Sequence, residues 1–147
     1  MNRLLALYRR LRPQQEGAVI IEFALLAPVL IAMMLGILQL GFAVQNYNAV
    51  RNVSADVARY ALIQYTTGHP LTNDAVIAQA ESIAEGPPYL LSPSRLDVAS
   101  TDVTSPQVTG TFEKTLTITY QIPTIFDHFG LHGPSISYSR SLIVPNS

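Results

Sequence analysis

One acidic residue stands inside a long apolar run near the N-terminus. Glu22 lies near the start of the run from Gly17 to Val44 and is the only charged residue in it. A carboxylate deep in a bilayer costs on the order of a few kcal/mol, so an acid in such a segment indicates a functional site with a partner. Counted from Ala18, Glu22 is the fifth residue. Residues one and five of a helix share a face, so this spacing points to a positive partner near Ala18.

The residues around Glu22 resemble a known processing signal. A leader with four arginines precedes Gly17–Phe23, in which a glycine, an apolar stretch and the acid follow one another. This arrangement resembles the cleavage site of type IV prepilins. The continuation Glu22–Leu30 and the later stretch Asn52–Ala61 resemble more specifically the TadE-like pseudopilins of the tight-adherence (Flp) pilus system. The resemblance covers about Gly17 to Tyr65 and implies that a prepilin peptidase cuts the leader after Gly17.

The implied cleavage between Gly17 and Ala18 would create a new α-amine on Ala18. A buried amine and a buried carboxylate relieve each other of an unpaired charge. The pair can form within one helix, or Glu22 of one subunit can meet the Ala18 amine of the next. The resemblance favours the pair between subunits, and the sequence alone leaves both open. A glycine at position 17 suits a peptidase whose catalytic groups must approach the backbone closely.

The resemblance also implies a function and partners. It implies a minor pseudopilin that helps to initiate, prime or cap filament assembly for adhesion. The implied partners are the prepilin peptidase, other pilins or pseudopilins of the same system, the pilus assembly platform and membrane lipid. The implied location is the bacterial inner membrane, or the assembled pilus after processing.

The apolar run is long enough to cross a bilayer, which needs about 20 apolar residues. By the positive-inside rule, the upstream arginines place the N-terminus in the cytoplasm and the C-terminal head in the periplasm. Pro28 predicts a helix kink, although membrane helices also tolerate proline without further consequence. We therefore expect a cleaved leader at 1–17, a transmembrane helix at 18–44 and an extracytoplasmic head at 45–147.

Two plainer interpretations compete with processing after Gly17. A secretory signal peptide could be cut near Gly41-Phe42-Ala43, but its apolar region is usually about 7–15 residues, shorter than this run. An uncleaved signal anchor explains the span and its orientation but gives no reason for Glu22. The anchor interpretation leads to an alternative function, in which the head scaffolds or binds an envelope secretion or assembly partner.

The rest of the chain alternates between helical and strand patterns. Residues 75–84 predict a short helix capped by Thr72 or Asn73, and 96–103, 116–122 and 136–144 show strand alternation. An apolar stripe predicts that the first helix continues beyond the membrane; its members are Val44, Tyr47, Val50, Val53, Val57, Tyr60 and Gln64. We expect an α+β fold. In it, a long N-terminal hydrophobic helix, made of a membrane span and an amphipathic outer half, carries a short helix and a small, mostly antiparallel sheet of three or four strands.

The sequence offers no recognisable catalytic set. It has no cysteine, no Gly-x-Ser-x-Gly motif and no glycine-rich phosphate loop. His128 and His132 are four residues apart, but Gly130 lies between them and no third ligand adjoins them, so we expect loop histidines and not a metal site. The leader arginines indicate topology rather than nucleic-acid binding. We therefore expect no enzymatic activity, no cofactor and no metal; the resemblance implies instead that this chain is the substrate of a peptidase.

Overall fold

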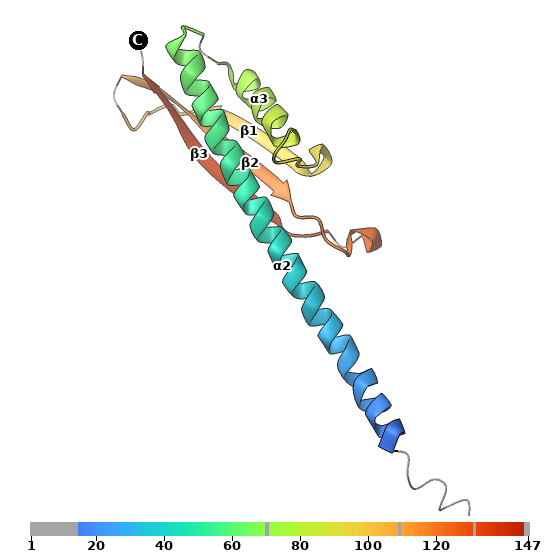
Figure 1. Cartoon of the computed structure of the whole chain (residues 1–147). Helices are drawn as coiled ribbons and strands as arrows, with labels where there is room; N and C mark the ends of the chain where they lie inside the picture. The colour runs from blue at the N-terminus through green and yellow to red at the C-terminus, as the bar shows by residue number, and fades with distance from the viewer. Residues whose placement is uncertain (1–14, 70, 109, 131, 146–147) are drawn as a thin grey trace, which may run out of the picture. The chain divides into compact units, whose positions relative to one another are not determined.

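The computed structural model describes residues 15–69, 71–108, 110–130 and 132–145. The chain divides into two compact units, Met1–Leu40 and Gly41–Ser147. The predicted α+β class is confirmed (Figure 1). The helices are α2 (Gln15–Thr66) and α3 (Asn73–Glu85), the strands are β1 (Leu96–Asp102), β2 (Thr111–Gln121) and β3 (Ser135–Pro145), and 3₁₀ turns lie at Pro93–Arg95 and Asp127–Phe129.

The first unit contains the apolar part of α2. The helix from Gly17 onward is long and apolar enough to cross a membrane. Its most apolar stretch of 18 residues has a mean hydropathy of 2.5, and none of that stretch is buried. Apart from Leu35, which is only partly exposed, its large apolar side chains from Val19 to Leu40 are exposed to more than half of their area. A continuous apolar surface of this kind marks a site for lipid or another protein. The helix therefore fits a single-pass membrane anchor.

The second unit contains a three-stranded antiparallel sheet in the order β1-β2-β3. The predicted alternation in β2 is confirmed: Leu116 and Ile118 are fully buried, whereas Thr117 and Thr119 are half-exposed on the other face. On that outer face, the hydroxyl of Thr117 pairs with Ser139 at 2.9 Å, and Thr119 donates to Ser137 at 3.2 Å. One face of the sheet is therefore apolar and the other is rich in hydroxyl groups.

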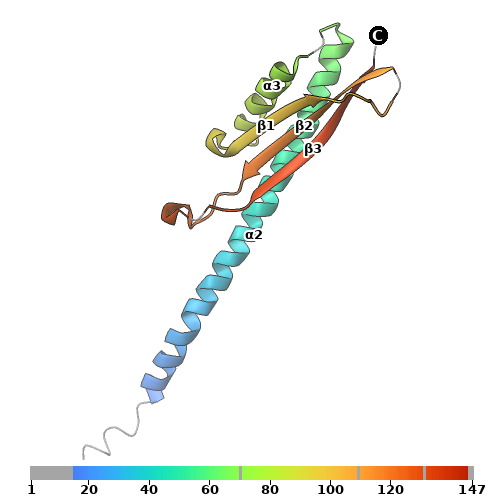
Figure 2. The same ribbon diagram turned by 180° about the vertical axis from the view of Figure 1, so that it is seen from behind.

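Both helical segments of the second unit cover the apolar face of the sheet, with α3 running along β1 (Figures 1 and 2). The predicted stripe on α2 is confirmed at its centre, where Val50, Val53 and Val57 have no exposed area. They join one core cluster with the buried residues of the other elements, among them Val76, Ala80, Ala84, Leu116 and Ile118. The outer half of α2 thus supplies the platform on which the head packs.

The connections explain where the elements begin and end. Thr72 is the N-cap of α3, and its hydroxyl accepts a hydrogen bond from the backbone N–H of Ala75 at 3.2 Å. The loop after β2 folds back on the end of that strand, because the N–H of Ile122 donates to the carbonyl of Pro134 at 3.0 Å. A side chain at Gly133 would collide with the Ile122 carbonyl oxygen. This close approach requires glycine.

Candidate functional site

The residues predicted for processing lie in the first turn of α2. The helix begins at Gln15, so the Gly17–Ala18 peptide bond is within helical backbone. The first four N–H groups of a helix lack intrahelical acceptors, but the carbonyls of residues 15–17 accept from residues four positions later. Cleavage at this bond stays a prediction, and it would require about one turn of the helix to open. The remainder of the expected leader, with its four arginines, lies outside the described residues.

The Glu22 side chain projects from an exposed face of the apolar helix. Within the described ranges, no hydrogen bond or ion pair involves its carboxylate. Ala18 is also exposed and lies one turn earlier on the same face. The structure thus brings the two expected pairing positions to one side of α2, where a second helix can reach them. Pro28 lies further along, and α2 is helical on both sides of it, so the expected kink stays a prediction.

A polar cluster in the second unit joins the start of α3 to the sheet. Lys114 on β2 forms an ion pair with Asp102 on β1 and donates to the side-chain oxygen of Asn73 at 3.0 Å. Asn73 in turn donates to Asp102 at 2.8 Å and accepts from Ser100 at 3.0 Å. The hydrogen bonds from Lys114 and Asn73 lower the pKa of the Asp102 carboxyl. These groups satisfy one another, which indicates a structural clamp and not a substrate site.

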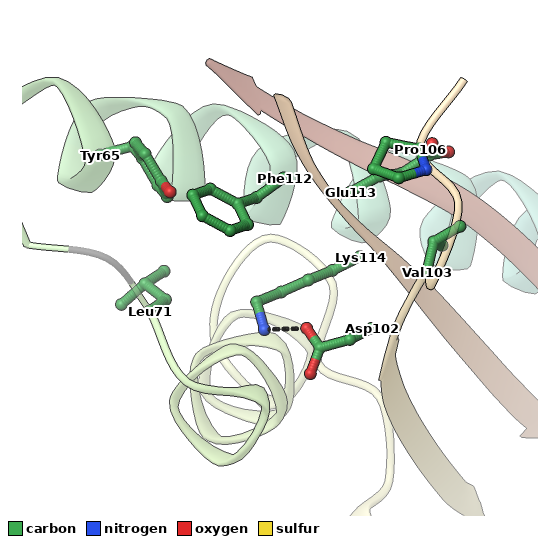
Figure 3. Close-up of a pocket in the computed structure, with 8 residues that line it drawn as sticks. All are labelled: Tyr65, Leu71, Asp102, Val103, Pro106, Phe112, Glu113 and Lys114. Atoms are coloured by element: carbon green, nitrogen blue, oxygen red, sulfur yellow. Dashed lines mark hydrogen bonds and ion pairs between the residues drawn. The ribbon is translucent and has the colours of Figure 1, made fainter. Parts of the chain in front are cut away.

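A cleft of about 510 Å³ lies beside this cluster. Figure 3 shows the rings of Tyr65 and Phe112 facing each other at its rim, with Leu71 opposite and the Lys114–Asp102 pair at one side. The ring centroids of Tyr65 and Phe112 are 6.4 Å apart. Because the lysine and the aspartate neutralise each other, the cleft suits an apolar group and lacks a free nucleophile or acid–base pair among its described lining residues.

Glu113 is a buried acid that sequence reasoning missed. Its side chain faces the β1–β2 loop, and the residue is only 4% exposed. Its carboxylate accepts a hydrogen bond from the backbone N–H of Gln107 at 2.8 Å, while its carbonyl accepts from the N–H of Val103 at 2.9 Å. Glu113 therefore fixes this loop. It shares its strand face with the half-exposed Thr115, so alternation alone gave no signal of burial.

Asp127 organises the loop after β2. Its carboxylate accepts from the backbone N–H of Thr124 at 2.8 Å and pairs with Arg95 at 2.9 Å. The hydrogen bond from the Thr124 backbone, followed by the Arg95 contacts, lowers the pKa of Asp127 to about 2 against the opposing effect of burial. His132 lies 3.9 Å from the same carboxylate, and His128 is exposed. No metal-binding group of three acidic, histidine or cysteine residues occurs among the residues that the structure describes.

The depressed pKa of Asp127 predicts acid-sensitive stability. A carboxyl whose pKa is lowered by folding stabilises the native state above its usual value of 3.8, and this contribution is lost as pH falls toward about 2. We expect Asp127→Asn to be less stable than wild type at neutral pH, with the difference shrinking through that window. Urea denaturation of the full chain in detergent, followed by near-UV tyrosine dichroism, measures this; a gap that stays constant with pH would contradict the assignment.

Comparison with known proteins bears on the N-terminal segment. A sequence model of the family described as TadE-like protein matches residues 17–59. The matched segment contains Gly17, Ala18, Glu22 and Pro28 and ends in the outer half of α2. The resemblance inferred from the sequence is thus confirmed over this segment. No curated protein and no solved structure matches the chain.

Proposed function

We propose that this chain, which is TadE-like over residues 17–59, is a minor pseudopilin of the tight-adherence pilus. The family match itself indicates a membrane-associated pilus component. The finer role is to initiate, prime or cap the filament for adhesion after cleavage by a prepilin peptidase. The observation that carries this proposal is Glu22, the single charge of the apolar run, five residues after Gly17. The role is structural, and the chain acts as substrate of an enzyme rather than as an enzyme.

Cleavage after Gly17 supplies the positive partner that Glu22 lacks. The new amine on Ala18 would stand at the N-terminus of the helix, where the helix dipole already places positive charge. A carboxylate one turn later, or from a neighbouring subunit, offsets both charges. A charge left unpaired in an apolar medium costs several kcal/mol, so pairing strongly favours one arrangement of the helices. A pair between subunits would fix how far each helix is displaced along its neighbour.

Pro28 supports a second element of the proposal. Proline has no N–H, so the carbonyl of Ala24 loses its usual helical partner. A membrane helix weakened at this point can bend or open locally when it leaves lipid for a helical bundle. We therefore propose that the helix adjusts near Pro28 during assembly, while the pairing of Ala18 and Glu22 fixes its register.

The proposed topology follows from the charge distribution. The leader arginines hold the N-terminus in the cytoplasm, and the head lies in the periplasm until assembly. In this arrangement the peptidase meets Gly17 at the inner-membrane surface. Other pilins and the assembly platform then meet the exposed apolar face of α2, which lipid covers beforehand.

Expression of the chain with and without its prepilin peptidase tests this function. With the peptidase, the mass of the membrane-extracted chain should fall by that of residues 1–17, and the shortened form should co-purify with partner pilins. Without it, the chain should stay full-length and outside the complex. An identical mass in both strains, together with normal partner binding, would favour an uncleaved anchor with a scaffolding head.

A further inference from the structure

The charged side chains of the second unit divide into a paired set and an unpaired set. Lys114 and Arg95 are bound to Asp102 and Asp127, as described above. Arg59 has only a 4.0 Å contact with Asp56. Among the described residues, no ion pair involves the remaining arginines of this unit, Arg51 and Arg140. The same holds for four of its acids, Asp74, Glu81, Glu85 and Asp97.

The arginines outside the paired set gather along a groove between α2 and the edge strand β3. The groove has a volume of about 380 Å³, and Ala55, Arg59 and Leu62 from α2 face Arg140 and Leu142 from β3 across it. Arg51 lies one turn before Ala55 on the same side of the helix. Leu62 is 48% exposed, so the groove combines positive charge with open apolar surface.

The outer face of α3 carries the opposite charge. Asp74, Ala78, Glu81 and Glu85 follow one another at spacings of four, three and four, and all four are exposed. Glu81 and Glu85 lie toward the C-terminal end of α3, whose last turn has no basic residue. Acidic side chains there are unfavourable with the helix dipole, and a cation from outside would offset this. The acidic face of α3 therefore suits a basic partner.

The basic groove and the acidic face lie at opposite edges of the head. The groove is bordered by β3, whereas α3 runs along β1, and β2 separates the two strands (Figures 1 and 2). The spacing of the basic residues along the groove is similar to the spacing of the acidic residues along α3. Arg51 and Arg59 are eight residues apart and Asp74 and Glu81 are seven, about 12 Å and 10.5 Å along their helices. Ala55 and Ala78 at the centres of the two stripes leave room for close approach.

We propose that α3 of one copy docks into the α2–β3 groove of the next copy. Because two different faces meet, the contact is head-to-tail and can repeat along a row of heads, unlike a closed two-fold dimer. The proposal goes beyond the function proposed above, since it requires neither cleavage after Gly17 nor the pairing of Glu22. It assigns a second contact, between heads, to a chain already expected to assemble through its first helix.

Thiol cross-linking in the native membrane tests the contact without background, because the chain has no cysteine. Differently tagged full-length copies carrying Ala55→Cys and Ala78→Cys are co-expressed and treated with a short bis-maleimide. The mixed product should exceed either homodimer at least about fivefold. Ala99→Cys, exposed on the outer face of β1, is the matched control and should give no product with Ala55→Cys. Equal yields for all pairs, or a dominant Ala78–Ala78 product, would overturn the proposal.

Charge reversal makes the test specific. In the cysteine-bearing copies, Glu81→Lys with Glu85→Lys should lower the mixed product about tenfold, because attraction becomes repulsion, and Arg51→Glu with Arg59→Glu should do the same. A copy with the reversed acidic face should cross-link again to a copy with the reversed groove. Failure of this rescue would also overturn the contact. Repeating the experiment in a strain without prepilin peptidase separates the two proposals, since only processing depends on that enzyme.

Discussion

A Glu22→Leu chain should insert into the membrane normally yet fail to enter a complex with partner pilins. Leucine suits the apolar helix, so insertion and topology are retained. After processing, however, the Ala18 amine would have no carboxylate to pair with. Leaving one member of a buried ion pair unpaired costs about 3–5 kcal/mol, which corresponds to a loss of incorporation of about a hundredfold or more. Co-purification of tagged chain with partner pilins, normalised to the amount in the membrane, measures the loss.

Two control variants show whether the position of the charge matters. Glu22→Asp keeps the carboxylate on a shorter stem and should retain part of the incorporation. Glu22→Leu combined with Leu26→Glu keeps the net charge but moves the acid one turn along the same face. This double variant should still fail to enter the complex, since its carboxylate no longer lies near the Ala18 amine. Incorporation of Glu22→Leu at the wild-type level would rule out a pairing role for the residue.

Gly17→Phe should block processing and leave the chain at full length. A bulky side chain at this position obstructs the approach of the peptidase to the backbone. It also stabilises the first turn of α2, because glycine weakens a helix by roughly 0.5–1 kcal/mol relative to alanine and so eases the opening that cleavage requires. We expect the processed fraction, read from the intact mass of the extracted chain, to fall at least about tenfold. The processed fraction of Gly17→Ala should lie between those of wild type and Gly17→Phe.

Gly36→Phe is the matched control for this effect. Gly36 is also in the apolar part of α2, and a β-carbon added there meets no described atom within 4 Å outside its own stretch of helix. The variant carries the same added bulk away from the Gly17–Ala18 bond, so processing should continue at the wild-type rate. Cleavage of Gly17→Phe at the same rate as Gly36→Phe would contradict the assignment of position 17.

Local patterns predicted the elements of this fold well, because helix and strand periodicities reflect which side of each element is buried. The stripe through Val50, Val53 and Val57 and the alternation of Leu116 and Ile118 are both confirmed. Contacts between distant residues left no such pattern. Asp56 lies outside the apolar stripe predicted on α2, yet its carboxylate accepts a hydrogen bond from the Tyr89 hydroxyl at 2.8 Å.

The same distinction applies to the candidate sites. Glu22 was visible in the sequence because one acid among apolar residues contrasts with its neighbours. The pairing of Asp127 with Arg95, and the burial of Glu113, depend on loops at the ends of the strands. Predicting the basic groove also requires knowing that β3 is an edge strand that lies beside α2. Neither the sequence of β3 nor that of α2 shows this by itself. Sequence spacing can therefore identify a charged stripe but not the surface that the stripe borders.

The N-terminal residue of the mature chain, isolated from its native envelope, tests the central claim most directly. Terminal sequencing or the mass of the first proteolytic peptide should identify Ala18, with its free amine one helical turn from Glu22. A chain that begins at Met1 would contradict processing and favour a permanent anchor. A chain cut near Ala43 would show instead that the apolar run is a removable export signal, leaving Glu22 without a role in the mature protein.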